Sequence, residues 1–309
     1  MKKGLPLIFF HKGDSYYLQF TFNQILHTNQ DSEIYLIGDE SNRHYEKLGI
    51  KHIDMSSCEK TAKEFEKIYV HLSSMNGFVE RICFQRWMYI RDFVLNAGIE
   101  GRFVCLDSDV LVYDDITNYC NSYCKDVDVT LHGKYGPGCN MFKDVGILTK
   151  LVDTMFRYYS SPKLVDGLKD IYVNALEREG KPHNITDMTM IEAFVDECGV
   201  STYDLLQIVD DTTFDSHLAK KTDQRFVFDG QFKKVLFKDG KAYCLRQNNK
   251  QPVKMIILHI QGFYKMYMYR YYTGNPKAVQ SKIKSWWGVF ILTFKRRTSH
   301  IISKIKGKK

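Results

Sequence analysis

The stretch RFVCLDSDVLVY, residues 102–113, decides the fold class of this chain. An apolar run at 103–106 and another at 110–112 flank two acidic residues, Asp107 and Asp109. Runs rich in Val and Leu without a helical period indicate a strand that is buried on both faces. Burying two unpaired carboxylates would cost several kcal/mol each. We therefore expect the strand to open into a site at which a divalent cation binds both aspartates.

The spacing of the two aspartates supports the same hypothesis but leaves an alternative. In extended backbone, residues two apart point to the same side, so Asp107 and Asp109 would converge while Ser108 faces elsewhere. Asp is also common at strand ends as a turn or capping residue, and a bare D-x-D motif is more often of that kind. A histidine at the end of a later predicted strand, His259, favours the metal site.

The segments around this stretch predict a doubly wound α/β sheet. Strands are expected at 5–11, 33–38, 51–55, 126–132, 205–209 and 255–258, with a hairpin at 234–245 around Asp239-Gly240. Helices are expected at 16–27, 150–159, 166–179, 188–198, and over 58–96 in two pieces broken near 76–77. The glycine-rich segment 133–140 is expected either to approach a ligand closely or to be a plain connection.

Two polar residues at predicted helices are further candidates. Arg86 lies on or beside an apolar helix face, where an arginine usually snorkels or forms a core ion pair. It could instead reach over a phosphate, because its helix leads directly into the aspartate strand. Asp187 follows Thr186, which would cap the next helix, and an acidic residue in a first helical turn is favoured by the helix dipole.

The last predicted strand ends in the sequence HIQGFYK, residues 259–265. A histidine at such a position is more often a hydrogen-bonded core residue than a ligand. Together with the two aspartates, however, His259 completes a donor set that suits Mn²⁺, which accepts imidazole alongside carboxylates. Gly262 permits close backbone approach and Lys265 adds a positive charge, so both could bind a metal-bound diphosphate.

The composition fits one large α/β domain, because 44 % of the 309 residues are hydrophobic and 14 % are aromatic. The sequence has no run of about 18 apolar residues, so we expect no membrane-spanning helix. Eight cysteines are scattered without zinc spacing, which favours a reducing, cytosolic compartment. The apolar core at 5–10 is too short for a signal peptide.

Charge is distributed unevenly along the chain. All 36 acidic residues precede position 240, whereas 16 of the 44 Lys and Arg residues follow it. Within 281–309, Trp286 and Trp287 stand among lysines and arginines, a composition typical of an interfacial amphipathic helix. We expect a basic amphipathic helical tail at 276–309 that binds an anionic membrane surface, and we expect no nucleic-acid partner.

These features, in this order, resemble the GT-A fold glycosyltransferases that use nucleotide sugars. They are closest in pattern to the retaining group that contains glycogenin and bacterial lipopolysaccharide galactosyltransferases. The resemblance covers residues 5–270. It is carried by Arg86, the LDSDVLV strand, Thr186-Asp187 before a helix, and the H-x-x-G-x-x-K motif that starts at His259.

The resemblance implies a Rossmann-like, mostly parallel mixed sheet flanked by helices over 1–275. It implies a hexosyltransferase that moves a sugar from a nucleoside-diphosphate sugar, with UDP as the nucleotide, to a glycan or lipid-linked acceptor in surface polysaccharide synthesis. The cofactor would be Mn²⁺ or Mg²⁺. Together with the tail and the cysteines, this predicts a cytoplasmic protein that is peripheral on the inner face of the membrane.

The resemblance also implies roles for individual residues. The metal ligands would be Asp107, Asp109 and His259. The nucleotide would contact Asp14, Tyr17, Asp107 and Ser108, and the diphosphate would contact Gly262 and Lys265. Asp39 is expected near the base for a different reason, its position directly after the strand predicted at 33–38. Arg86 and Asp187 would act as catalytic residues beside the reacting sugar.

The chain departs from this group at two places, and other protein classes share parts of its pattern. Met266-Tyr267 stands where the group has Pro-Trp, and Thr186-Asp187-Met188 where it has Asp-Gln-Asp, so retaining and inverting chemistry both stay open. A phosphatase of the haloacid dehalogenase type would place D-x-D on its first strand. A sugar nucleotidyltransferase would carry a basic, glycine-rich loop after that strand. The non-enzymatic alternative is a membrane-peripheral binding protein with structural aspartates.

Overall fold

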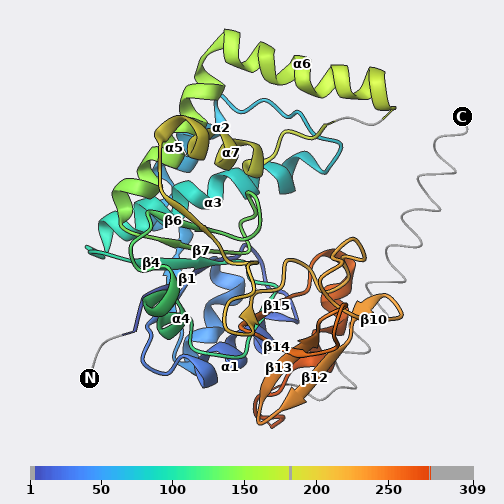
Figure 1. Cartoon of the computed structure of the whole chain (residues 1–309). Helices are drawn as coiled ribbons and strands as arrows, with labels where there is room; N and C mark the ends of the chain where they lie inside the picture. Colours follow the sequence, from blue (N-terminus) through green and yellow to red (C-terminus); the bar gives the residue numbers. More distant parts are fainter. Residues whose placement is uncertain (1–3, 181–182, 278, 280–309) are drawn as a thin grey trace, which may run out of the picture.

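The computed structural model describes residues 4–180, 183–277 and 279 (Figure 1). Within them the centre of the protein is a seven-stranded sheet in the order β3-β2-β1-β4-β7-β6-β8. β7 runs antiparallel to both of its neighbours, and the other adjacent pairs are parallel. This is the mostly parallel, mixed α/β sheet that the sequence predicts. Its strands are β1 (Leu7–Phe10), β2 (Ile34–Gly38), β3 (Lys51–Asp54), β4 (Phe103–Leu106), β6 (Val129–Leu131), β7 (Cys139–Phe142) and β8 (Thr202–Asp204).

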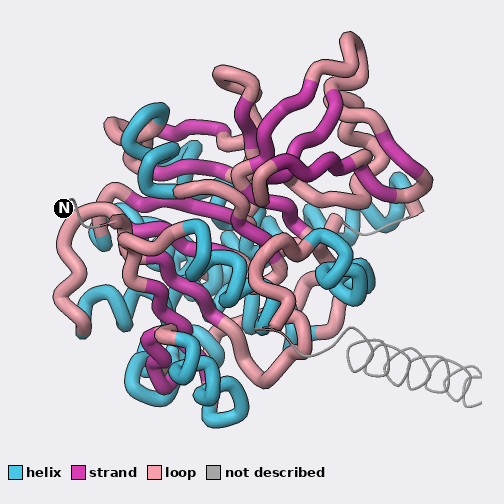
Figure 2. The backbone as a smooth tube through the Cα atoms, turned by 90° about the horizontal axis from the view of Figure 1, so that it is seen from below, coloured by secondary structure: helices cyan, strands magenta, loops and turns pink. Residues whose placement is uncertain are grey.

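Apolar side chains that point alternately to the two faces of the sheet explain why both faces are covered. Leu7 and Phe9 of β1 pack into one hydrophobic cluster, whereas Ile8 between them packs into another. The strands therefore lie between layers of helices (Figure 1, Figure 2). The helices on the Ile8 side are α2 (Lys60–Glu66), α3 (Gly77–Asn96), α5 (Val145–Ser160) and α7 (Asp187–Cys198). The opposite side is covered by α1 (Leu18–Thr28), α4 (Ile116–Tyr123) and a smaller sheet.

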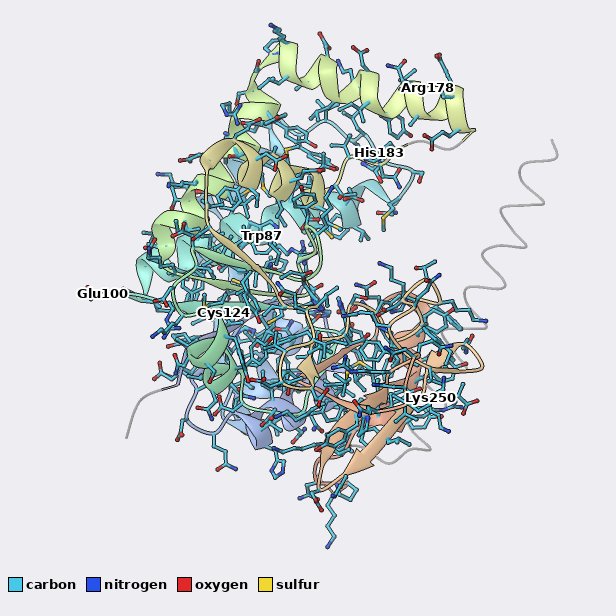
Figure 3. All side chains as sticks on the ribbon, in the orientation of Figure 1. Trp87, Glu100, Cys124, Arg178, His183 and Lys250 are labelled. Atoms are coloured by element: carbon cyan, nitrogen blue, oxygen red, sulfur yellow. The ribbon has the colours of Figure 1, made fainter. Side chains whose placement is uncertain are left out.

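The smaller sheet has the order β12-β13-β14-β9. The predicted hairpin joins β12 to β13, and Asp239 and Gly240 take the positive φ values, +50° and +74°, that a tight two-residue turn requires. In Figure 3, Lys250 marks this part of the molecule and Arg178 marks α6 (Pro162–Glu179) at the other end. The strands are β9 (Thr212–Thr213), β12 (Val235–Lys238), β13 (Lys241–Leu245) and β14 (Pro252–Met255).

One strand pairing brings a C-terminal segment of the chain next to the aspartate stretch. β15 (Ile257–His259) follows the small sheet and pairs antiparallel with β5 (Val110–Val112), which comes directly after the aspartates. This pairing carries the C-terminal part of the fold to the D-x-D motif. The remaining short elements are η1 (Glu40–Leu48), η2 (Met55–Cys58), β10 (Phe228–Asp229), β11 (Phe232–Lys233), η3 (Gly262–Tyr267) and α8 (Met268–Tyr271).

Two strand predictions and one loop prediction differ from the structure. Residues 205–209 form a turn instead of a strand, because Asp204 accepts a hydrogen bond from Leu206 N and thereby ends β8. The glycine-rich segment 133–140 was predicted as a loop throughout, but it runs into β7, whose backbone pairs with β4. The predicted strand at 255–258 is divided between β14 and β15, which pair with different partners.

Two helix predictions also differ from the structure. The helical region 58–96 is interrupted between Glu66 and Gly77, because backbone groups at Leu72 and Ser74 bond to the segment that precedes α7. The helix expected at 16–27 begins only at Leu18. The Ser15 hydroxyl lies 3.1 Å from a ring nitrogen of His11.

The predicted membrane tail lies largely outside the described residues, which leave out 280–309, and the boundary at 275/276 remains a prediction. Within the described part of the chain, no helix combines the length and apolar character needed to cross a membrane. All eight cysteines are free thiols, and most of them are buried.

Candidate active site

Three side chains able to bind a metal meet where β4, β5 and β15 come together. Asp107 and Asp109 lie in the turn between β4 and β5, and His259 is opposite Val110 in the β15–β5 pairing. His259 Nε2 lies 3.1 Å from Asp109 Oδ1 and 3.5 Å from Asp107 Oδ2. One ligand atom from each of the three residues lies within 4.8 Å of the others. The convergence arises from a turn, and not from the extended backbone that the spacing predicted.

The chemistry of these donors fits a divalent metal ion. Asp109 and His259 are buried, and His259 Nδ1 lies 3.2 Å from the side-chain amide of Gln261. This contact orients the ring so that Nε2 faces the two carboxylates. Two carboxylates and one imidazole nitrogen form a mixed oxygen and nitrogen set of the kind that binds divalent ions.

Two cations compensate the negative charge of the aspartates. Arg86 Nη1 lies 2.6 Å from Asp107 Oδ1, and Lys265 Nζ lies 3.0 Å from Asp109 Oδ2. Burial raises the pKa of Asp107, and Arg86 opposes part of that rise. Burial acts in the same direction on Asp109, but His259 and Lys265 outweigh it and hold the pKa of Asp109 well below its ordinary range. Asp109 is therefore ionised at neutral pH and is the stronger acid of the two carboxyl groups.

Arg86 links Asp107 to a third carboxylate, that of Asp187. Asp187 is buried at the start of α7 and accepts hydrogen bonds from Arg86 and, at 3.1 Å, from Trp87 Nε1. Thr186 caps α7 as the sequence predicts, since its hydroxyl oxygen accepts from the helix backbone. Trp87, labelled in Figure 3, lies on α3 in the body of the molecule. The core ion pair expected for Arg86 is thus present, and it borders the ligand group.

Of the residues proposed for nucleotide binding, Tyr17 contacts this group directly, and Ser108 contacts the neighbouring His11. Lys265 Nζ lies 3.4 Å from the Tyr17 hydroxyl and 5.1 Å from the centre of the Tyr17 ring. The Ser108 hydroxyl lies 2.8 Å from His11 Nδ1. Burial, with Lys265 nearby, lowers the pKa of His11 to about 4, so its imidazole is neutral at pH 7. Gly262, at the start of η3, adopts a positive φ of +61° that a side chain would disfavour.

Asp39 and Asp14 lie further along the same edge of the fold. Asp39 caps η1 through Ser41 N and accepts a 2.6 Å hydrogen bond from Gly13 N, so it holds the loop that follows β1. Asp14 lines a cavity of ≈ 450 Å³ that includes Tyr45 and His44. The structure therefore places Asp14 on the η1 side of α1, whereas Tyr17 faces Lys265.

Sequence reasoning missed a second histidine beside the site. The His132 ring stacks on the His259 ring, with centroids 5.5 Å apart. Burial, reinforced by His259, lowers the pKa of His132 to about 3. Gly138 passes close to both rings, because a Cβ built there would lie 2.1 Å from His132 Nδ1 and 2.8 Å from His259 Nδ1. The close approach expected of the glycine-rich segment is made to these histidines. The available signal was that His132 is the last residue of the strand predicted at 126–132.

No protein-family model and no curated protein matches this chain. Its structure is similar to solved structures of glycosyltransferases. The galactosyltransferase LgtC with donor and acceptor sugar analogues is 14 % identical, with a TM-score of 0.42 over 86 % of this chain and 94 % of that one. Mouse xyloside xylosyltransferase 1 is 10 % identical, with a TM-score of 0.39 over 65 % and 84 %. GlyE of Streptococcus pneumoniae is 15 % identical, with a TM-score of 0.37 over 66 % and 45 %.

Proposed function

We propose that this chain is a metal-dependent glycosyltransferase. It would move a sugar from a nucleoside-diphosphate sugar, with UDP as the nucleotide, to a glycan or lipid-linked acceptor in surface polysaccharide synthesis. The observation that carries the proposal is the meeting of Asp107, Asp109 and His259 between two cations, Arg86 and Lys265. We assign the ion as Mn²⁺ or Mg²⁺, and the imidazole among its ligands favours Mn²⁺.

For this reaction, the side chains around Asp107 and Asp109 must bind and stabilise a leaving nucleoside diphosphate. Asp107, Asp109 and His259 would hold a divalent ion, which would neutralise the charge that develops on the diphosphate as the bond to the sugar breaks. Lys265 supplies a further positive charge at the same place. Burial would lower the pKa of Lys265, but Asp109 outweighs it and keeps the pKa above its ordinary value, so the ammonium stays protonated at neutral pH. We place the diphosphate against Lys265 and Gly262.

Arg86 and Asp187 would lie beside the donor sugar. Arg86 is held by two carboxylates, so its guanidinium is fixed in one orientation before any ligand binds. Its Nε is buried and has no hydrogen-bond partner among the described atoms. Pre-organised groups of this kind act without reorganising during the reaction. The anomeric configuration of the product distinguishes a retaining reaction from an inverting one.

The remaining nucleotide contacts follow from neighbouring side chains. Tyr17 lies beneath Lys265, and Ser108 lies between the two aspartates, so both border the proposed diphosphate position. We assign Asp39 and Asp14 to the nucleoside side of the site. The tail at 276–309 would hold the enzyme on an anionic membrane at the cytoplasmic face, near a lipid-linked acceptor.

Thermal unfolding with UDP, GDP and CMP, each with and without Mn²⁺, tests the proposal. At about one hundred times its dissociation constant, a ligand of the folded state should add about 2.7 kcal/mol of stability. We expect UDP to stabilise the chain only with Mn²⁺, and Asp109→Asn to abolish the effect. Asp166→Asn, an exposed carboxylate on α6, is the matched control. If none of the three nucleotides stabilises the chain in a metal-dependent way, the proposed function is refuted.

A second assay separates the transferase from the nucleotidyltransferase alternative. Incubation with UDP-sugars and Mn²⁺ should release UDP and transfer or hydrolyse the sugar. Release of pyrophosphate from UTP and a sugar phosphate would instead identify a nucleotidyltransferase.

A further inference from the structure

A buried ion pair lies behind the metal-binding face of His259. Lys233 and Asp215 have side chains that are 0 % exposed, and Lys233 Nζ lies 2.5 Å from Asp215 Oδ1. Lys233 also pairs with Asp223, which in turn binds Arg225. A charged cluster this deep in the core needs a reason, because such pairs add little net stability compared with an apolar core.

Asp215 holds the backbone of His259 in place. Its second carboxylate oxygen, Oδ2, accepts a 3.1 Å hydrogen bond from His259 N. On either side of this bond, Asp215 N donates to Ile257 O at 3.3 Å and Leu218 N donates to His259 O at 2.8 Å. A side-chain oxygen thus occupies the place that a neighbouring strand's carbonyl would take.

The opposite edge of β15 is held by β5, the strand that follows the aspartates. His259 is in register with Val110 of β5, and Ile260 N donates to Asp109 O at 2.9 Å. The histidine backbone is therefore clamped between β5 and Asp215. A displacement of Asp215 would move His259 relative to the two aspartates.

Asp215 also contacts the histidine that stacks on His259. The main-chain carbonyl of Asp215 lies 2.7 Å from His132 Nε2, which donates to it. One residue therefore sets the backbone of His259 through its side chain and the ring of His132 through its main chain. Lys233 neutralises the carboxylate that makes the first of these contacts.

We propose that Asp215, neutralised by Lys233, is a positioning residue that fixes His259 as a metal ligand. The inference rests on the proposed function, because it assumes that the three residues bind a divalent ion. It predicts that metal affinity depends on a hydrogen-bond acceptor at position 215. It also predicts that the buried charges themselves are dispensable.

Two double variants with the same net charge as the wild type separate these factors. Asp215→Ala with Lys233→Met removes the acceptor, whereas Asp215→Asn with Lys233→Met keeps an amide oxygen that can accept from His259 N. Asp223 retains Arg225 as its partner in both variants. The readout is the dissociation constant for Mn²⁺, measured by titration calorimetry on the full chain without nucleotide. Measurements are made well below the unfolding midpoint of each variant.

We expect the alanine double variant to bind Mn²⁺ about 10- to 100-fold more weakly, the usual effect of losing an outer partner of a metal ligand. The asparagine double variant should stay within about threefold of the wild type, which supports the inference. If the alanine variant does not fold, Asp215→Glu takes its place, since it keeps the charge but moves the acceptor by one methylene; it should show the same loss.

The inference is overturned if both double variants bind Mn²⁺ as the wild type does, or if both lose affinity equally. In either case the wild type still binds the ion, so the proposed function stands. If the wild type itself binds no Mn²⁺, the positioning role and the proposed metal dependence are both refuted.

Discussion

Replacing Gly138 by alanine tests whether the stacked histidines are held as tightly as the structure indicates. A Cβ at this position would lie 2.1 Å from His132 Nδ1 and 2.8 Å from His259 Nδ1, where real Cβ contacts stay beyond 3.0 Å. The His132 ring must therefore retreat by about 0.9 Å and the His259 ring by about 0.2 Å. A movement of that size strains the 2.7 Å hydrogen bond from His132 Nε2 to Asp215 O.

We expect Gly138→Ala to lower the free energy of unfolding by about 2–4 kcal/mol. Overpacking a core costs about 1–3 kcal/mol, and an unmade buried hydrogen bond costs a similar amount. For a chain of this size the unfolding midpoint should fall by roughly 3–6 °C. Because His259 is displaced from the aspartates, affinity for Mn²⁺ should fall by about 10- to 100-fold. Thermal unfolding and titration calorimetry measure the two effects separately.

Gly167→Ala is the matched control for this experiment. Gly167 lies within α6, and a Cβ built there meets nothing within 4 Å. This substitution should leave Mn²⁺ affinity unchanged and raise stability by about 0.5–1 kcal/mol, because alanine is the better helix former. If Gly138→Ala is as stable as the wild type and binds Mn²⁺ as tightly, the tight packing of the two histidines is refuted.

Three further predictions address pH, the donor and the tail. Burial, reinforced by His259, lowers the pKa of His132 to about 3 from 6.5. Between these pH values the unfolded chain binds a proton that the folded chain does not, so stability should rise with pH by up to about 1.4 kcal/mol per unit. Urea unfolding of His132→Gln should give a flatter profile; coincident profiles would contradict the assignment. Lys265→Met should not weaken Mn²⁺ binding, because it removes a cation that competes for Asp109, but it should weaken UDP binding about 10- to 100-fold in calorimetry; unchanged UDP binding would remove Lys265 from the diphosphate site. Deleting 281–309 should release the protein from anionic vesicles in sedimentation while UDP-dependent stabilisation persists; retained vesicle binding would refute the role of the tail.

Much of the site was visible in the sequence because its signals are local. The apolar runs around Asp107 and Asp109 predict where a buried strand must open, and the strand before His259 predicts the same for the histidine. Desolvation then requires partners for these charges. The structure brings the three residues together, but through a turn at residues 107–109 instead of through extended alternation.

The less accurate predictions concern segments whose structure depends on distant partners. Residues 67–76 have a helical pattern, yet backbone groups at Leu72 and Ser74 bond to the segment before α7. Similarly, β7 was not predicted at the end of the glycine-rich segment, because its residues become a strand only when β4 and β6 pair with them. Tertiary hydrogen bonds outweigh local preference at such places.

The sequence by itself determined the α/β class, the element types of its strongly periodic segments, and the identity of the metal-binding candidates. Each depends on the order of apolar and charged side chains over a few residues. Only the tertiary structure decided which charges pair: Arg86 with both Asp107 and Asp187, and Lys233 with Asp215 behind His259. The physical reason is that an ion pair or a stacked ring can join any two compatible residues. The choice among them is made by strand register and packing between segments far apart in the chain.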